Sequence, residues 1–104
     1  MSKQSVLLVC GSGASSGFMA AATRKAAKKS GLDLDIKARS ESEAEDFMDK
    51  IDLLLFAPHL KYMLDDFKEM TDKNNVKSAV IPQMIYGSLD GKRLVKFIEK
   101  ELGE

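Results

Sequence analysis

Short apolar runs alternate with longer amphipathic segments along the whole chain. The runs at residues 5–9 and 51–57 are apolar at consecutive positions, which predicts two strands covered on both faces. Residues 32–38 alternate between apolar and charged, which predicts a strand at the edge of the sheet with one wetter face. A fourth strand is predicted for residues 76–81, where Pro82 ends it.

Between these runs, apolar residues return at intervals of three and four positions, as on one face of a helix. Gly31 is suited to end the first such segment, since glycine adopts left-handed conformations readily. Ser40 and Glu43 have the spacing of a capping box, which predicts the start of a short helix. Helices are predicted over residues 15–31, 40–48, 60–70 and 94–102, the last of them after an Asp90-Gly91 turn.

Strands that alternate with helices predict an α/β fold, with an open four-stranded parallel sheet and helices on both faces. No repeat, linker or low-complexity tract divides the 104 residues, so we expect one domain over residues 1–104. Ligands of such sheets bind beyond the carboxyl ends of the strands, where the chain order reverses. Cys10 follows the first strand and therefore lies at such an end.

Composition limits the kinds of function. Sixteen basic and sixteen acidic residues give no net charge, so we expect no nucleic-acid partner and no overall attraction to an anionic membrane. No run approaches the roughly 20 apolar residues of a membrane span, and the polar start is unlike a signal peptide, so we expect a cytoplasmic protein without membrane insertion. One cysteine and one histidine predict no internal disulfide, no metal site and no cofactor.

Residues 10–17 read Cys-Gly-Ser-Gly-Ala-Ser-Ser-Gly, between a predicted strand and a predicted helix. Glycines let several backbone N–H groups point inward, and a helix N-terminus adds roughly half a positive charge, which together favour a bound phosphate. The same field favours a thiolate, so Cys10 is the predicted catalytic nucleophile. The predicted phosphoryl-binding residues are Gly11, Ser12, Gly13, Ala14, Ser15, Ser16 and Gly17.

Other phosphate-binding loops fit these residues less well. A P-loop needs a lysine where Phe18 follows Gly17, and the glycine spacing has one residue too many for a dinucleotide-binding loop. A cysteine phosphatase or arsenate reductase of similar fold is the runner-up, but its phosphate-clamping arginine is replaced by Ser16. A phosphoryl receiver domain would need an acid at the end of the third strand, where this chain has Phe56-Ala57-Pro58. An inert cysteine that ends a strand stays the plainest alternative.

Three segments together form a recognisable combination. They are Val6-Leu7-Leu8-Val9-Cys10 with its Gly/Ser/Ala loop, Ala57-Pro58 followed by Tyr62-Met63-Leu64, and Tyr86-Gly87 with Asp90-Gly91. In order and spacing they resemble the IIB component of the lactose/cellobiose type of the bacterial phosphoenolpyruvate-dependent sugar phosphotransferase system.

The resemblance implies strand order 2-1-3-4, a fold similar to low-molecular-weight tyrosine phosphatases, and an active-site cysteine matching Cys10. It implies a phosphotransferase that accepts a phosphoryl group from a phosphohistidine on a IIA partner and forms a phosphocysteine. The phosphocysteine then phosphorylates a sugar bound by the membrane IIC component. The sugars it implies are β-linked disaccharides such as cellobiose, lactose or chitobiose.

The chain departs from the family after Ala57-Pro58, where glutamine is common and His59 stands here. His59 is a candidate accessory residue that could face Cys10, against the alternative of an idle exposed histidine. Tyr86 and Gln83 could approach the loop, but a tyrosine packed on the last helix is the simpler interpretation.

Two further expectations concern the surroundings of the loop. Arg24, the first cation after it, is expected to point to solvent rather than to the phosphoryl site. The apolar residues Phe18 and Met19 are expected to contact the IIA partner, because the donor must come within reach of the sulfur.

Overall fold

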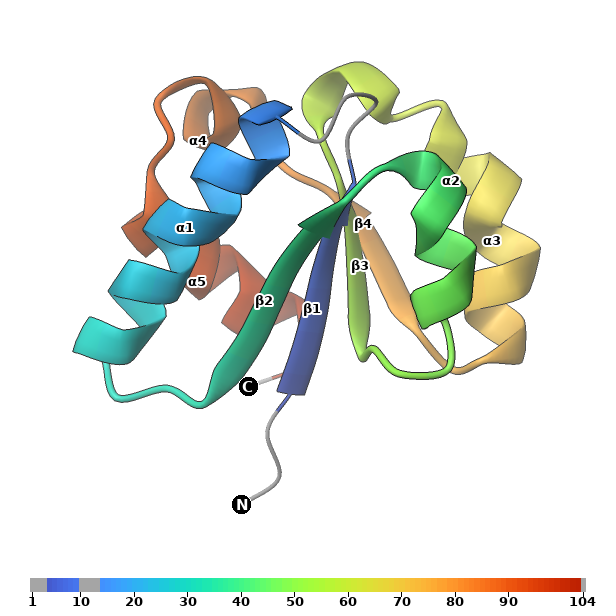
Figure 1. Ribbon diagram of the computed structural model, residues 1–104, viewed down its shortest axis with the longest axis horizontal. Helices are drawn as coiled ribbons and strands as arrows, with labels where there is room; N and C mark the ends of the chain where they lie inside the picture. The colour runs from blue at the N-terminus through green and yellow to red at the C-terminus, as the bar shows by residue number, and fades with distance from the viewer. Residues whose placement is uncertain (1–3, 10–13, 104) are drawn as a thin grey trace.

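Four parallel strands form the middle layer of the protein, in the order β2-β1-β3-β4 (Figure 1). The computed structural model describes residues 4–9 and 14–103, the side chains of residues 14–16 excepted. The strands are β1 (Gln4–Val9), β2 (Leu34–Arg39), β3 (Leu53–Phe56) and β4 (Lys77–Val80). The predicted parallel sheet and the strand order implied by the resemblance are both confirmed, and β2 lies at an edge as expected.

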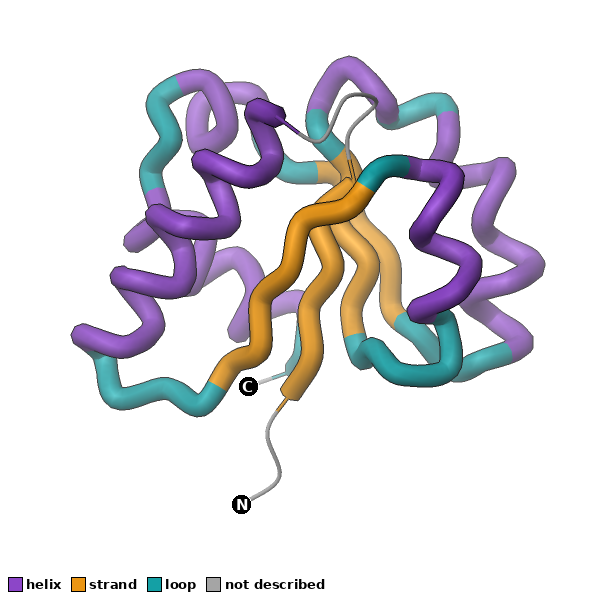
Figure 2. Tube along the Cα trace, in the orientation of Figure 1, coloured by secondary structure: helices purple, strands orange, loops and turns teal. Residues whose placement is uncertain are grey.

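Helical segments of different length connect and cover the strands (Figure 2). The α-helices are α1 (Ala14–Lys29), α2 (Glu41–Ala44), α3 (Met63–Lys73), α4 (Gln83–Gly87) and α5 (Gly91–Glu101). The single turns η1 (Glu45–Phe47) and η2 (Pro58–Leu60) are 3₁₀ helices. Gly31, at φ 73°, follows the end of α1 as predicted, because this left-handed conformation suits glycine.

The two faces of the sheet carry separate hydrophobic cores. Val6 and Leu8 of β1 pack with α1 and α5 on one face. Leu7 and Val9 of the same strand pack with α2 and α3 on the other. All four are at most 1% exposed, which explains why β1 is apolar at consecutive positions rather than alternating.

Local details differ from the prediction at three places. The Ser40 hydroxyl donates to the Glu43 carboxylate (3.1 Å) and caps no backbone N–H, so the capping-box spacing is present without its usual hydrogen bonds. Helix α3 begins at Met63 rather than near residue 60, because Pro58 first opens the η2 turn. The short helix α4 was not predicted.

Candidate functional site

Three strands end side by side at one margin of the sheet, here called the carboxyl edge. The Ala57 amide donates to the carbonyl oxygen of Val9 (3.1 Å), and the Ile81 amide donates to that of Phe56 (2.9 Å). Each of these hydrogen bonds joins the residue that follows one strand to the last residue of the neighbouring strand. β1 therefore ends at Val9 between its neighbours β2 and β3, and Cys10 is the next residue in the sequence.

The carboxyl end of β1 is also the switch point of the sheet. From β1 the chain passes through α1 to β2 on one side, whereas β3 and β4 lie on the other side. The helices leave on opposite faces at this point, α1 on one and α2 and α3 on the other. Open parallel sheets place their ligands at such a point, because diverging connections leave a crevice there.

Part of the predicted phosphoryl-binding loop lies outside the described residues. This holds for Cys10, Gly11, Ser12 and Gly13, and for the side chains of Ala14, Ser15 and Ser16. The described backbone provides both anchors of the loop, with β1 ending at Val9 and α1 beginning at Ala14. Gly17 belongs to the first turn of α1, and beyond its own helix backbone a Cβ there would have open space around it.

Helix α1 gives this region a positive end. It spans 16 residues, has no acidic residue in its first turn, and has two lysines in its last turn. The lysines stabilise the negative end of the helix dipole, while no carboxylate offsets the positive end next to the loop. An anion bound before Ala14 would meet this field.

His59 and Tyr86 meet at the carboxyl edge. His59 lies exposed in η2 after β3, and Tyr86 lies partly buried in α4 after β4. Their ring centroids are 6.3 Å apart at an interplanar angle of 68°, an edge-to-face arrangement. Tyr86 packs against both hydrophobic cores rather than against the last helix alone, so it helps to hold the ends of β3 and β4 in place. Gln83 is exposed at the start of α4.

Two arginines, Arg24 in α1 and Arg39 at the end of β2, are bound by described residues. Arg24 donates to the carbonyl oxygen of Ile36 (2.6 Å), so it points toward β2 and not simply to solvent as expected. Arg39 lies opposite Val9 in the sheet register, but its guanidinium contacts the Glu43 carboxylate (3.9 Å) and stacks on the Phe47 ring (5.4 Å).

Large apolar side chains are exposed around the same edge. Phe18 (69% exposed), Tyr62 (63%) and Met84 (74%) follow β1, β3 and β4 respectively, and Leu89 (43%) lies just past α4. Met19 is fully buried, so the expectation that it contacts a partner is wrong: this position of α1 faces the sheet. Exposed apolar side chains gathered on one margin are typical of a protein–protein contact surface.

Two other kinds of feature are absent from the described part of the chain. There, no three side chains of histidine, cysteine, aspartate or glutamate lie close enough to hold a metal ion together. In the same residues, no helix is long and apolar enough to cross a membrane.

Comparison with known proteins decides the family. Residues 5–97 match the family described as "PTS system, Lactose/Cellobiose specific IIB subunit". The chain belongs to this IIB family. It is therefore a phosphotransferase component that acts as a phosphocarrier in sugar uptake.

The relatives of this IIB chain include a protein that it covers almost completely and much longer proteins of which it matches only a part. It is 30% identical over 88 residues to the oligo-beta-mannoside-specific EIIB component of Bacillus subtilis, and the match covers 85% of each chain. It is 31% identical over 99 residues to the lactose-specific EIICB component of Lacticaseibacillus casei, covering 93% of this chain but 17% of that protein.

Solved structures confirm the fold of the IIB chain. The lactose-specific IIB domain from Streptococcus pneumoniae superposes with a TM-score of 0.88 over 96% of this chain and 98% of that one, at 18% identity. YwlE of Bacillus subtilis, with a fold like that of low-molecular-weight tyrosine phosphatases, superposes with a TM-score of 0.57 at 16% identity, over 97% of this chain and 94% of that one. The similarity to that phosphatase fold is thus confirmed.

Proposed function

We propose that this IIB chain carries the phosphoryl group on the sulfur of Cys10. The supporting observation is the position of Cys10 in the sequence, directly after the buried central strand β1 at the switch point and four residues before α1. Residues 11–17 then supply backbone N–H groups and hydroxyls for the phosphoryl oxygens, next to the uncompensated positive end of α1.

Phosphoryl transfer through Cys10 takes two balanced steps. The thiolate attacks the phosphorus of a phosphohistidine on a IIA protein, the S–P bond forms, and the N–P bond breaks with its electron pair returning to the imidazole. A sugar hydroxyl then attacks the same phosphorus, the O–P bond forms, the S–P bond breaks, and the hydroxyl proton leaves to a base. The thiolate is regenerated, so the protein acts catalytically.

The partners follow from this mechanism and from the relatives. The donor is a IIA phosphohistidine protein, and the acceptor is a sugar held by a membrane IIC component. The relatives are named for lactose and for oligo-beta-mannosides, which supports a β-linked disaccharide such as lactose, cellobiose or chitobiose as the sugar. In this proposal the chain is one IIB domain over residues 1–104 that acts in the cytoplasm, and it needs neither a cofactor nor a metal ion.

Intact-mass analysis tests the carrier. After incubation with phosphoenolpyruvate and the upstream phosphocarriers, the protein should gain the mass of one phosphoryl group, and Cys10→Ser should gain none. Serine has nearly the volume of cysteine but lacks the sulfur nucleophile, so the variant should keep its circular dichroism spectrum and melting temperature. A Cys10→Ser variant that still acquires the phosphoryl group and passes it to sugar would overturn the proposal.

A further inference from the structure

The two helical layers of the protein carry opposite charge. Helices α1 and α5, which cover one face of the sheet, contain eight basic residues and two acidic ones. The segments α2, η1 and α3, which cover the other face, contain eight acidic residues and two basic ones. The formal net charge of zero thus conceals an excess of six positive charges in one layer and six negative charges in the other.

Most of the basic side chains in α1 and α5 are available to a partner. Arg24 is bound to the Ile36 carbonyl oxygen, and Arg93 pairs with Asp90 at 3.3 Å. Six exposed lysines have no ion pair with any described residue: Lys25, Lys28, Lys29, Lys92, Lys96 and Lys100. Exposed lysines without a partner attract anions at low cost, since no existing pair has to be broken.

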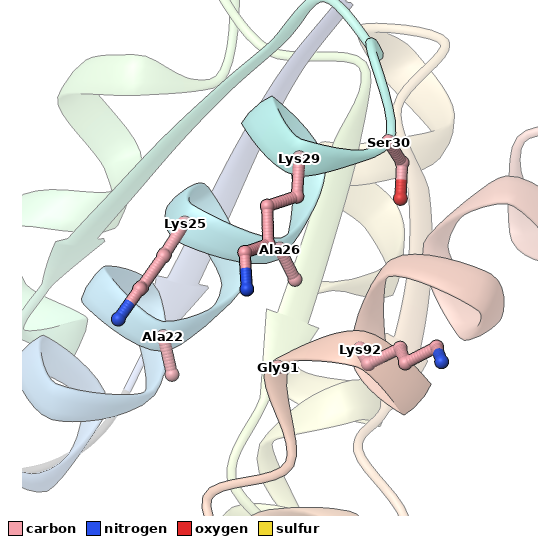
Figure 3. Close-up of a pocket in the computed structure, with 7 residues that line it drawn as sticks. All are labelled: Ala22, Lys25, Ala26, Lys29, Ser30, Gly91 and Lys92. Carbon is pink, nitrogen blue, oxygen red and sulfur yellow. The ribbon is translucent and has the colours of Figure 1, made fainter.

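A cleft lies between α1 and α5 in the middle of this face (Figure 3). Its volume is about 440 Å³. At this cleft Gly91 of α5 packs directly on the backbone of Ala22 in α1. Lys25, Lys29 and Lys92 are among the residues that line the cleft. In Figure 3 the first two lysines extend from α1, while Lys92 extends from α5 away from them. Their ammonium groups are therefore spread over the face and do not converge on one point.

We propose that the α1–α5 face binds the anionic phospholipid surface of a membrane. Spread, flexible lysines suit a diffuse layer of headgroup phosphates better than one small anion, which needs convergent donors. Each lysine close to an anionic leaflet contributes roughly 1 kcal/mol to binding. The acidic layer on the opposite side of the sheet is repelled by the same leaflet, so the molecule binds in one orientation.

This orientation serves the carrier, and to that extent the inference depends on the proposed function. Helix α1 lies on the membrane-facing side, and Cys10 belongs to the four residues that connect the end of β1 to the start of α1. Binding through the α1–α5 face would leave the carboxyl edge open to the side. A IIC component in the same membrane could then reach Cys10 without displacing the lipid contact.

Sedimentation with vesicles tests the lipid contact without any phosphoryl transfer. The full chain should bind vesicles of phosphatidylcholine with about a third phosphatidylglycerol, and should not bind phosphatidylcholine alone. Binding should weaken as salt rises, since the attraction is screened. Lys25→Glu with Lys29→Glu should lower the partition coefficient at least about 30-fold, and Lys25→Gln with Lys29→Gln less.

Lys68→Glu with Lys73→Glu on α3 is the matched control, with the same change in net charge on the acidic layer. This variant should bind vesicles nearly as wild type does. Absence of binding at low ionic strength, or an equal loss in the α1 and α3 variants, would overturn the proposal. Amide shifts around the cleft on adding inorganic phosphate, with no vesicle binding, would also overturn it by showing a soluble anion site instead. If Cys10 accepts no phosphoryl group but vesicles still bind, only the carrier proposal fails.

Discussion

At the scale of residues, two arginines, one in α1 and one opposite the end of β1 in the sheet, are held by other partners. Arg39 pairs with Glu43 and stacks on Phe47, and Arg24 binds a carbonyl oxygen of β2. A phosphatase of similar fold would need an arginine at the position of Ser16 to stabilise the oxygens of the transferring group. In the proposed mechanism, backbone dipoles and hydroxyls take the place of that arginine and hold the phosphocysteine while still allowing its release.

The absence of that arginine predicts poor phosphatase activity. We expect hydrolysis of p-nitrophenyl phosphate by wild type to be no faster than by the Cys10→Ser variant, because neither a guanidinium nor a positioned acid assists the leaving group. The release of p-nitrophenol measures this. Robust turnover that depends on Cys10 would instead favour the cysteine phosphatase alternative.

His59 offers a second prediction about a single side chain. His59→Gln should change the rate of phosphoryl acceptance less than about threefold, because an exposed imidazole interacts weakly with charges across solvent. Rapid-quench measurements across the pH range of histidine titration would show it, with His59→Ala as control for loss of the ring contact to Tyr86. A pH dependence that disappears in His59→Gln would instead assign the imidazole a direct role.

The sequence predicted some residues of the site better than others. The end of β1 at Val9, directly before Cys10 in the sequence, was predicted from the apolar run, since strands buried on both faces are apolar at consecutive positions. Tyr86 was set aside because its role depends on α4, a five-residue helix too short to show periodicity. Met19 was misassigned because Phe18 and Met19 are equally apolar, and only packing decides which of two neighbours faces the sheet.

At the scale of elements, the contact between α1 and α5 depends on one glycine. A Cβ at Gly91 would overlap the backbone carbonyl of Ala22, so α1 and α5 could no longer pack this closely. We expect Gly91→Ala to lower the free energy of unfolding by about 2 kcal/mol, as overpacking against a rigid backbone does. Urea denaturation measures the loss.

Gly87→Ala is the matched control for that substitution. Its Cβ would meet only the flexible Gln83 side chain at 3.5 Å, so we expect no loss, and a gain of up to about 1 kcal/mol from helix propensity. If both substitutions lowered the free energy of unfolding equally, the close packing of α5 on α1 would not be the cause of the loss.

The elements themselves were largely predictable, for a physical reason. Strands buried on both faces and helices with one apolar stripe leave different periods in the sequence, so all four strands and four of the five α-helices were anticipated. The exact ends were not, because they depend on local hydrogen bonds. The Asp52 carboxylate, for example, accepts from the Ser5 amide (2.8 Å), just before the first ladder pair of β3 with β1.

At the scale of the whole molecule, the carboxyl edge should be the surface that meets the IIA donor. Phe18, Tyr62 and Met84 are exposed around it, and transfer requires phosphorus within roughly 3 to 3.5 Å of the attacking sulfur. We expect amide shifts on titration with a IIA protein to gather on the starts of α1 and α4 and on η2. Met84→Ser should weaken the complex, and Leu89→Ser, past α4, should weaken it less.

Shifts gathered at the opposite edge of the sheet, near Asp33 and Asp52, would contradict this surface.

The distribution of charge over the whole molecule could not be predicted from the sequence alone. A net charge of zero predicted no attraction to an anionic surface, but opposite charges lie on opposite layers, and only the fold determines which helices share a face.

The position of β1 in the sheet also determines when, during synthesis, the strand before the proposed nucleophile gains both of its neighbouring strands. β1 leaves the ribosome first, yet it lies between β2 and β3, and β3 is made only from Leu53 onward. A nascent chain that stops before Leu53 leaves one side of β1 without its ladder, open to pairing with other chains. The end of β1 thus lies between two neighbouring strands only after β3 has emerged and docked. If Cys10 carries the phosphoryl group as proposed, the strand order itself disfavours phosphorylation of unfinished chains.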